Sequence, residues 1–488
     1  MRRFVLLCVL LSSAVARMLA GEARPNVLLI AVDDLNDWVG CLQGHPQAFT
    51  PNLDRLAKRG VLFANAHCQA PLCNPSRTSL LFGRRPSTTG IYGLAPAPRQ
   101  VEALRTAVSL PQAFAAAGYH TAACGKIFHD AGEAKLTEEF QAVGTRGAPP
   151  YPTKKFVSTP DAMKAVDWGA FEADEKKHGD WQIAEAAIGQ LQAAPADRPF
   201  LIAAGFRYPH LPCFAPPAWF ARFPVDITLP SMRLDDRQDV PAFAWYLHWS
   251  LPEPRLTWLQ AHQQWQPLVR SYLASTAFMD AQLGRLLDAL DAHPRGRDTI
   301  VVLWSDHGWH LGEKGITGKN TLWERSTRVP LIIAGPGIAP GICREPAELL
   351  DLYPTLAARC ALKAPVELEG LDLSPQLADV RTARTRPALT THNRGNHAVR
   401  STRWRYIRYA DGAQELYDLE RDPNEWTNLA SDPAQAAIIA DHVRFLPATD
   451  APLVPGSAHR ILEQRDGVWW WEGKPIAPGA VPPGSAFP

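Results

Sequence analysis

The chain has almost no net charge: 50 lysines and arginines face 49 aspartates and glutamates, which leaves a formal charge of +1. A chain without a global basic field can hold a polyanion only through local groups, so the composition argues against nucleic-acid binding. Beyond its first residues the chain also has no apolar run near the ~20 residues that span a bilayer. We therefore expect no membrane span in the mature protein.

Cysteine is scarce and scattered, with eight residues in 488. No CxxC pair and no dense spacing is present, which excludes a disulfide scaffold and a structural zinc site of that type. Cys8 falls in the N-terminal leader, and Cys73 belongs to a motif described below. The other six are expected as buried thiols, with one or two disulfides left open: Cys41, Cys68, Cys124, Cys213, Cys343 and Cys360.

The N-terminus has the three parts of a secretory signal peptide. Met1-Arg2-Arg3 is basic, Phe4–Leu11 is apolar, and small residues continue through Ala16. An uncleaved anchor is the alternative, but the apolar run is too short to cross a bilayer comfortably. We predict a signal peptide over residues 1–23 and an exported protein, periplasmic or secreted.

Apolar runs alternate with amphipathic segments along the first three quarters of the chain. Continuous apolar runs predict strands buried on both faces of a sheet: Asn26–Val32, Tyr119–Cys124, Phe200–Ala204, Thr299–Ser305 and Val329–Ala334. Helical spacing and capping residues predict helices over residues 51–59, 76–82, 109–117, 181–193 and about 268–290. This alternation indicates an α/β fold with a large, mostly parallel sheet flanked by helices.

The pattern changes after about residue 385. Ala398–Tyr409 and Glu415–Leu419 predict antiparallel strands of a smaller α+β domain, and the tail after Gly473 is rich in proline and glycine. Trp469-Trp470-Trp471 precedes that tail; packing is favoured for it over contact with sugar rings. We predict a catalytic domain over 24–385 and a C-terminal domain over 386–488.

Residues 73–84 (CNPSRTSLLFGR) form the most specific motif in the chain. A lone cysteine is more often a buried thiol than a catalyst. Here, however, Pro75 favours a helix start, and side chains at a helix N-terminus face free N–H groups and the positive end of the helix dipole. Arg77 follows one helical turn later, and its planar guanidinium can donate two parallel hydrogen bonds to an oxyanion.

Two pairs of polar residues follow buried strands. Asp33-Asp34 comes after the first strand, and Asp306-His307 comes after the strand Thr299–Ser305. Because ligands gather at the carboxyl ends of parallel strands, the two pairs are expected to meet. Three carboxylates suit calcium or magnesium, whereas imidazole suits softer metals, so His307 is either a ligand or a polar neighbour. A helix cap or a solvated surface pair is the alternative for each pair alone.

Several cations and imidazoles also follow predicted strands. Lys126 and His129 come after Tyr119–Cys124, His210 comes after Phe200–Ala204, and Lys319 lies thirteen residues beyond Asp306. Each is weak evidence alone. Together they offer charge neutralisation for a transferring group and an acid and a base for proton transfer.

These residues resemble the type I sulfatases, and among them the iduronate-2-sulfatase-like branch, over most of the chain. The dodecapeptide matches that family's C-x-P-S-R-x-x-x-L-x-G-R signature at each fixed position. The resemblance implies an alkaline-phosphatase-like sandwich fold, and oxidation of Cys73 to formylglycine (3-oxoalanine) by a formylglycine-generating enzyme. It further implies that one calcium ion is held by Asp33, Asp34, Cys73, Asp306 and His307.

The resemblance also implies roles in catalysis. The formylglycine hydrate attacks sulfur, and the sulfate is surrounded by Arg77, Lys126, His129, His210 and Lys319. His210, with or without Lys319, would protonate the departing alcohol. His129 would take a proton from the second hydroxyl of the hydrate, which releases sulfate and restores the aldehyde.

The expected substrate is a sulfated carbohydrate, either a polysaccharide or its fragments. The rim of the site is expected from Trp309-His310 and Ala95–Gln100. Four arginines of the C-terminal strands are candidates for binding a polyanion: Arg400, Arg403, Arg405 and Arg408. For Arg403 and Arg405 the alternative is that they form the solvated face of a strand. Two alternatives stay open, a phosphonate or phosphodiester hydrolase with the same signature, and a catalytically silent protein that binds sulfated glycans.

Overall fold

A computed structural model describes residues 24–129, 136–233 and 235–482. The predicted signal peptide lies outside these residues. Within them, no helix combines the length and the apolar composition needed to cross a bilayer.

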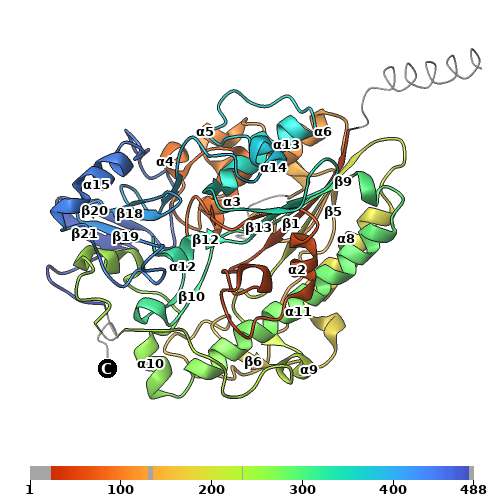
Figure 1. The fold of residues 1–488 in the computed structure, drawn as a ribbon. Helices are drawn as coiled ribbons and strands as arrows, with labels where there is room; N and C mark the ends of the chain where they lie inside the picture. Colours follow the sequence, from red (N-terminus) through yellow and green to blue (C-terminus); the bar gives the residue numbers. More distant parts are fainter. Residues whose placement is uncertain (1–23, 130–135, 234, 483–488) are drawn as a thin grey trace, which may run out of the picture.

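An eight-stranded sheet forms the centre of the molecule, in the order β14-β2-β13-β9-β1-β7-β4-β5 (Figure 1). Its strands are β1 (Asn26–Val32), β2 (Val61–Phe63), β4 (His120–Gly125), β5 (Ala142–Val143), β7 (Phe200–Phe206), β9 (Thr299–Ser305), β13 (Leu331–Ala334) and β14 (Gly341–Cys343). Every neighbouring pair is parallel except the two made by β13. The mostly parallel sheet is therefore confirmed.

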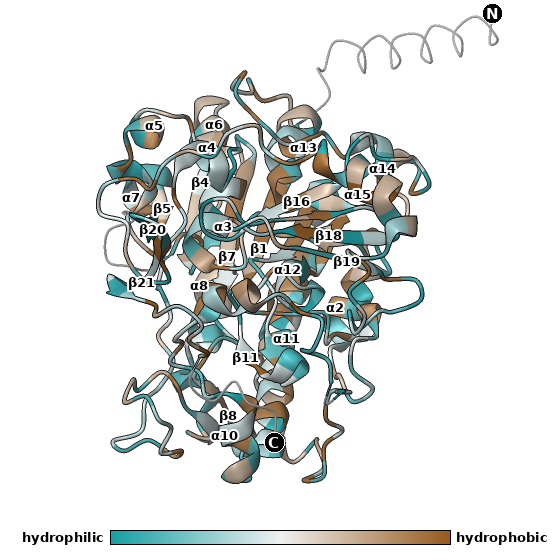
Figure 2. Cartoon of the chain, turned by 90° about the vertical axis from the view of Figure 1, so that its left-hand side faces the viewer, coloured by the Kyte–Doolittle hydropathy of each residue, from teal (hydrophilic) through white to brown (hydrophobic). Residues whose placement is uncertain are grey.

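Helices cover both faces of this sheet, as predicted. Along β1, Leu28, Ile30 and Val32 belong to one hydrophobic core, while Val27, Leu29 and Ala31 belong to a second core on the other face. The first core is completed by α2 (Pro51–Ala57), α8 (Gly179–Gln192) and α11 (Trp265–Ala292), and the second by α3 (Cys73–Phe82), α6 (Leu110–Ala116) and α13 (Leu352–Arg359). Figure 2 shows apolar residues concentrated around β1 in the middle of the molecule.

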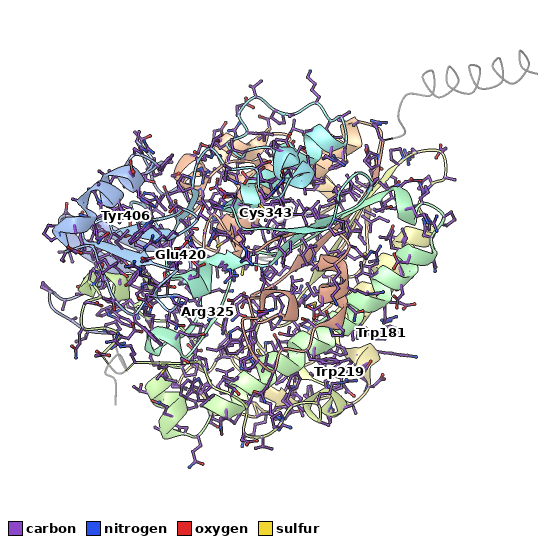
Figure 3. The ribbon with its side chains drawn as sticks, in the orientation of Figure 1. Trp181, Trp219, Arg325, Cys343, Tyr406 and Glu420 are labelled. Carbon is purple, nitrogen blue, oxygen red and sulfur yellow. The ribbon has the colours of Figure 1, made fainter. Side chains whose placement is uncertain are left out.

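A smaller antiparallel sheet lies beside this body, in blue in Figure 1. Its strands are β16 (Ala388–Thr391), β17 (His397–Arg400), β18 (Trp404–Arg408) and β19 (Gln414–Asp418), followed by α15 (Ala436–Val443) and a three-stranded sheet of β20 (Leu462–Arg465), β21 (Val468–Trp471) and β22 (Lys474–Pro475). Figure 3 places Tyr406 of this sheet on the opposite side of the molecule from Trp181 and Trp219, which flank α11. Trp471 is buried in the core of this region, which confirms packing for that residue. The predicted domain boundary at residue 385 stays a prediction.

Two of the four arginines considered from the sequence, Arg400 and Arg405, are buried and so do not form a solvated face or a polyanion surface, whereas Arg403 is half-exposed. Arg405 is fully buried, and its guanidinium contacts Glu324, Glu425 and the carbonyl oxygen of Leu322. Arg400 also pairs with Glu324, at 3.2 Å. These arginines join the C-terminal sheet to the loop that follows β11 (Thr317–Gly318).

The structure also tests the predicted strand over residues 329–334 and the predicted state of the cysteines. The apolar run Val329–Ala334 is not one strand, because Pro330 divides it between β12 (Arg328–Val329) and β13, which belong to different sheets. All seven cysteines among the described residues are free thiols, and all but Cys41 are buried. The expectation of buried thiols is thus largely confirmed.

Candidate active site

The two acidic pairs meet where β1 and β9 end. The strands are parallel neighbours in a register that places Val32 beside Ser305, so Asp33 and Asp306 leave the sheet together. Asp34 has a left-handed backbone (φ 61°), a conformation that costs free energy in a non-glycine residue. It is held there because its N–H donates to Asp306 Oδ1 (3.1 Å) and its carbonyl oxygen accepts from Tyr272 (2.8 Å).

Cys73 is the first residue of α3 and lies against these strand ends. Its Sγ is 3.2 Å from His307 Nε2, 3.1 Å from Lys319 Nζ and 3.7 Å from Asp33 Oδ1. The side chain is almost completely buried. The helix begins two residues before the predicted Pro75 start, which places Cys73 inside its first turn.

Arg77 lies one turn further along α3, beneath the two strands. Its guanidinium contacts Asp306 (Nε to Oδ2, 2.8 Å) and Asp33 (Nη2 to Oδ1, 3.2 Å), and it donates to the carbonyl oxygens of Lys126 and Ile127. Arg77 is fully buried, so these contacts consume its donors inside the protein. In this structure Arg77 orders the carboxylates instead of facing an open cavity.

Lys126 and Lys319 approach the carboxylates from two directions. Lys126 Nζ lies 2.5 Å from Asp33 Oδ2, and Lys319 Nζ lies 2.7 Å from Asp34 Oδ1. Lys126 gets this close because β4 ends in Gly125 and the second-last residue of β7 is Gly205: a Cβ on Gly205 would lie 2.1 Å from the Lys126 carbonyl oxygen. Lys319 is fixed by its neighbour Asn320, whose N–H donates to Pro71 just before α3 (3.2 Å).

The two histidines are placed differently. His210 Nδ1 lies 2.5 Å from the Leu211 carbonyl oxygen, which leaves Nε2 facing Asp34 Oδ2 at 3.9 Å. His129 is half-buried, and its Nδ1 is buried with no hydrogen-bond partner among the described residues. The structure thus brings His210 into the cluster, while no described contact joins His129 to it.

Burial and the neighbouring charges set the protonation of the site. Burial raises the pKa of Asp34 and of Asp306 to about 6, whereas for Asp33 the charges of Lys126, His210 and Arg77 outweigh burial and hold its pKa well below the usual range. Burial disfavours the Cys73 thiolate, but Lys126 and Lys319 outweigh it and lower the pKa of this thiol well below its usual value. The pocket at Cys73 therefore stabilises a negative charge on that side chain.

The three carboxylates of the cluster suit a hard divalent cation. Ligand atoms of Asp33, Cys73, Asp306 and His307 all lie within 4.8 Å of one another, and Asp34 Oδ1 is 3.4 Å from His307 Nε2. Asp34 Oδ2 is buried without a hydrogen-bond partner, which leaves a carboxylate oxygen unsatisfied.

His307 is also arranged as a ligand. Its Nδ1 donates to the Gly308 carbonyl oxygen at 3.0 Å, so the second proton of the charged ring is on Nε2, which faces the carboxylates, and its loss would leave the lone pair there. Asp306 and its neighbours raise the pKa of His307 to about 9 against the effect of burial. A metal ion bound to His307 would displace the proton from Nε2.

Two further residues support the site: Ser76 belongs to the motif of residues 73–84, and Tyr272 carries no sequence signal of its own. Ser76 Oγ donates to the Asp306 carbonyl oxygen (2.5 Å), and Tyr272 on α11 fixes Asp34. The expected rim is wrong in part: Trp309 and His310 are buried, and the Trp309 ring lies 5.5 Å from Lys319 Nζ. Asn74 instead donates to the carbonyl oxygens of Gly93 and Pro96, both at 3.0 Å, which ties the loop containing Ala95 to α3.

Comparison with known proteins gives a consistent result. A family model described as Sulfatase matches residues 25–360, and one described as N-sulphoglucosamine sulphohydrolase, C-terminal, matches residues 312–448. A sulfatase of Formosa agariphila is 38% identical over 444 residues, which is 88% of this chain and 87% of the relative.

Two relatives with more specific names are also similar. Human iduronate 2-sulfatase is 33% identical, over 70% of each chain. Choline-sulfatase of Rhizobium meliloti is 31% identical, over 93% of this chain and 94% of the relative. Among solved structures, a 2-O GAG sulfatase superposes with a TM-score of 0.68 at 26% identity, over 86% of this chain and 90% of the other. This likeness confirms the predicted alkaline-phosphatase-like architecture.

Proposed function

The chain belongs to the sulfatase family, and from this premise we propose that it removes sulfate from a sulfated carbohydrate with a formylglycine formed at Cys73. The proposed metal is one calcium ion. Its ligands are Asp33, Asp34, Asp306, His307 and the modified Cys73. The observation that carries this proposal is the position of Cys73 Sγ, within 3.7 Å of Lys319, His307 and Asp33 in a buried, charge-lined site.

The charges of the site support an anionic substrate bound together with a divalent cation. Three carboxylates face the three permanent cations Arg77, Lys126 and Lys319, so these groups balance without a metal. A calcium ion would add two positive charges. A sulfate monoester carries one negative charge and a deprotonated hydrate carries one, which together restore the balance.

The proposed calcium ion and formylglycine would each supply part of the chemistry of sulfate-ester hydrolysis. Calcium would act as a Lewis acid that neutralises sulfate oxygens, and formylglycine would supply a hydrate with one hydroxyl as nucleophile and a second for sulfate release. Lys126 and Lys319 are proposed to bind the sulfate oxygens. Both form ion pairs with the carboxylates of the site, and both lower the pKa of the Cys73 thiol. Arg77 is proposed to act mainly by orienting Asp33 and Asp306.

Proton transfer is assigned to the two histidines. His210 Nε2 faces the site because Nδ1 donates to the Leu211 carbonyl oxygen. Burial lowers the pKa of His210 to about 4, so the neutral ring has its lone pair on Nε2, and it is the doubly protonated ring that is the proposed donor to the departing alcohol. His129 Nδ1, buried without a described partner, is the proposed acceptor of a hydrate proton.

A carbohydrate is preferred as substrate because two similar proteins are named for sulfated sugar acids or glycosaminoglycans. Choline sulfate is the comparison substrate, since a similar protein is named for it. The N-terminal basic, apolar and small-residue pattern supports export, and the Cys73 motif supports maturation by a formylglycine-generating enzyme.

The test is coexpression with a formylglycine-generating enzyme, followed by mass spectrometry of the peptide that contains Cys73 and by turnover assays. We expect the aldehyde or its hydrate at Cys73, and release of sulfate from sulfated sugars faster than from choline sulfate. An aryl phosphodiester serves as a second comparison. An unmodified thiol in active protein, or faster phosphodiester cleavage, contradicts the proposal.

A further inference from the structure

We infer that Arg460 is a specificity-determining residue, which binds a second anionic group of the substrate beside the sulfate that is removed. The inference rests on the proposed function and deepens it, because it assigns a charge to the part of the substrate outside the sulfate. The anion is a carboxylate of a sugar acid or a second sulfate ester.

Arg460 is brought to the site by the C-terminal region, through His392. This histidine is fully buried and lies 3.4 Å (Nε2) from Asn320 Nδ2, next to the active-site Lys319. Asn393, the residue after His392, donates from Nδ2 to the Arg460 carbonyl oxygen (3.1 Å), so the two segments lie side by side. The backbone of Arg460 is therefore held beside the buried histidine that contacts the Lys319 segment.

The backbone that carries Arg460 is held in an unfavourable conformation. His459 and Arg460 both have positive φ angles, 63° and 70°, and neither is a glycine. Such a conformation persists only where its surroundings fix it. Asn393 does so on one side: its Nδ2 donates to the Arg460 carbonyl oxygen (3.1 Å) and its Oδ1 accepts from the Leu462 N–H (3.1 Å).

The other side of this segment is fixed to the signature helix. Leu94 N–H donates to the His459 carbonyl oxygen (3.1 Å), and Ala95 pairs with Ala458 in an isolated β-bridge. The contact needs Gly93, where a Cβ would lie 2.6 Å from the Ala458 carbonyl oxygen. Asn74, the residue after Cys73, binds both Gly93 and Pro96. A continuous set of contacts thus positions Arg460 relative to Cys73.

The side chain of Arg460 is available for a ligand. It is half-buried, and no carboxylate pairs with it among the residues that the structure describes. Arg400, Arg403 and Arg405, by contrast, are each paired with an acidic side chain. A half-buried guanidinium without a partner is a good site for a carboxylate or sulfate, which it can bind through two parallel hydrogen bonds.

Arg460→Asn is the variant of choice, because asparagine tolerates a left-handed backbone and removes the charge. Arg465→Asn is the matched control: it removes an exposed arginine from the adjacent strand β20, where it pairs with Glu463. The four probes are 4-nitrophenyl sulfate, a monosulfated neutral sugar, a monosulfated uronic acid and a disulfated neutral sugar. Turnover is measured in matured enzyme, and binding is measured by calorimetry in the Cys73→Ala background.

We expect Arg460→Asn to lower kcat/KM and affinity about 10- to 100-fold for a probe with a second anion, and less than twofold for the first two probes. Loss only with the uronic acid identifies a carboxylate, and loss only with the disulfated sugar identifies a second sulfate. An equal effect on all four probes, or no effect on any, overturns the inference. Absence of turnover of every probe by the wild type contradicts the proposed function instead, while the binding comparison still tests Arg460.

Discussion

Asp180 is a buried carboxylate that the proposed mechanism uses only indirectly, which makes Asp180→Ala an informative change. It is the second residue of α8, and it accepts hydrogen bonds from the backbone N–H groups of Arg207 (2.7 Å) and Tyr208 (3.1 Å). The same turn closes when His210 N–H donates to the Arg207 carbonyl oxygen (2.9 Å). Asp180 therefore anchors the segment that carries His210.

The magnitude follows from the two N–H groups that would lose their acceptor. Each buried donor left without a partner costs about 1–3 kcal/mol. We expect the free energy of unfolding to fall by roughly 2–4 kcal/mol, since a water in the vacated space would satisfy part of the loss. A shift of about 1 Å at His210 is enough to reduce turnover on the order of 100-fold where proton transfer limits the rate.

The assay combines urea unfolding with turnover of two sulfate esters. A sugar sulfate needs a proton on its leaving alcohol, whereas 4-nitrophenyl sulfate has a leaving group stable as an anion. Asp180→Ala should therefore slow the sugar sulfate by about 100-fold and the aryl sulfate by less than about 10-fold. Asp174→Ala is the control, because it removes an exposed carboxylate that also accepts from a backbone N–H. Equal loss for the two esters, or unchanged stability, would refute the reasoning.

Burial raises the pKa of Asp180 to about 7, above its unfolded value near 4, so its stabilising contribution is complete at low pH and is lost as the pH rises from about 4 to 7. Asp180→Asn should remove this component in urea unfolding, and a difference from wild type that is independent of pH contradicts it. Cys73→Ala should abolish turnover and leave the circular dichroism spectrum unchanged; residual sulfatase activity would disprove a role for this residue. Calcium at 100 times its Kd should add about 2.7 kcal/mol of stability in thermal unfolding, and EGTA should reverse it; a Tm insensitive to both argues against the metal. Arg405→Met should lower the free energy of unfolding by about 3–5 kcal/mol, because Glu324 and Glu425 would stay buried without it. Arg403→Met removes a half-exposed partner of Asp418 and should have a much smaller effect; equal losses in urea unfolding would contradict this account.

The sequence predicted the parts of the site that follow from sheet topology. Continuous apolar runs identify β1 and β9, and residues that follow neighbouring parallel strands must meet, so Asp33 and Asp306 could be paired in advance. The sequence predicted that Lys126 lies at this edge of the sheet, but not that it contacts Asp33. That contact depends on the close approach of two strands at Gly125 and Gly205.

The remaining features depend on partners far away in the chain. Arg405 alternates with apolar residues in β18, a pattern typical of a solvated face, and only the fold brings Glu324 and Glu425 to it. Tyr272 lies on the apolar side of α11 like any core residue, and nothing local indicates that its hydroxyl fixes Asp34. The antiparallel direction of β13 likewise cannot be derived from an apolar run, because such a run has no direction.

The burial of Cys73 has a consequence for the order of folding and of the proposed modification. Once the chain has folded, the thiol lies beneath Lys319 and His307 and is only 1% exposed, so another enzyme has no access to it. The proposed oxidation of Cys73 would therefore have to take place on the unfolded chain. A molecule that folded first would retain the thiol. Under the proposed mechanism, the active fraction of a preparation would depend on the relative rates of folding and of Cys73 oxidation. Protein refolded from a denatured, unmodified stock would be native in shape and would contain no matured site.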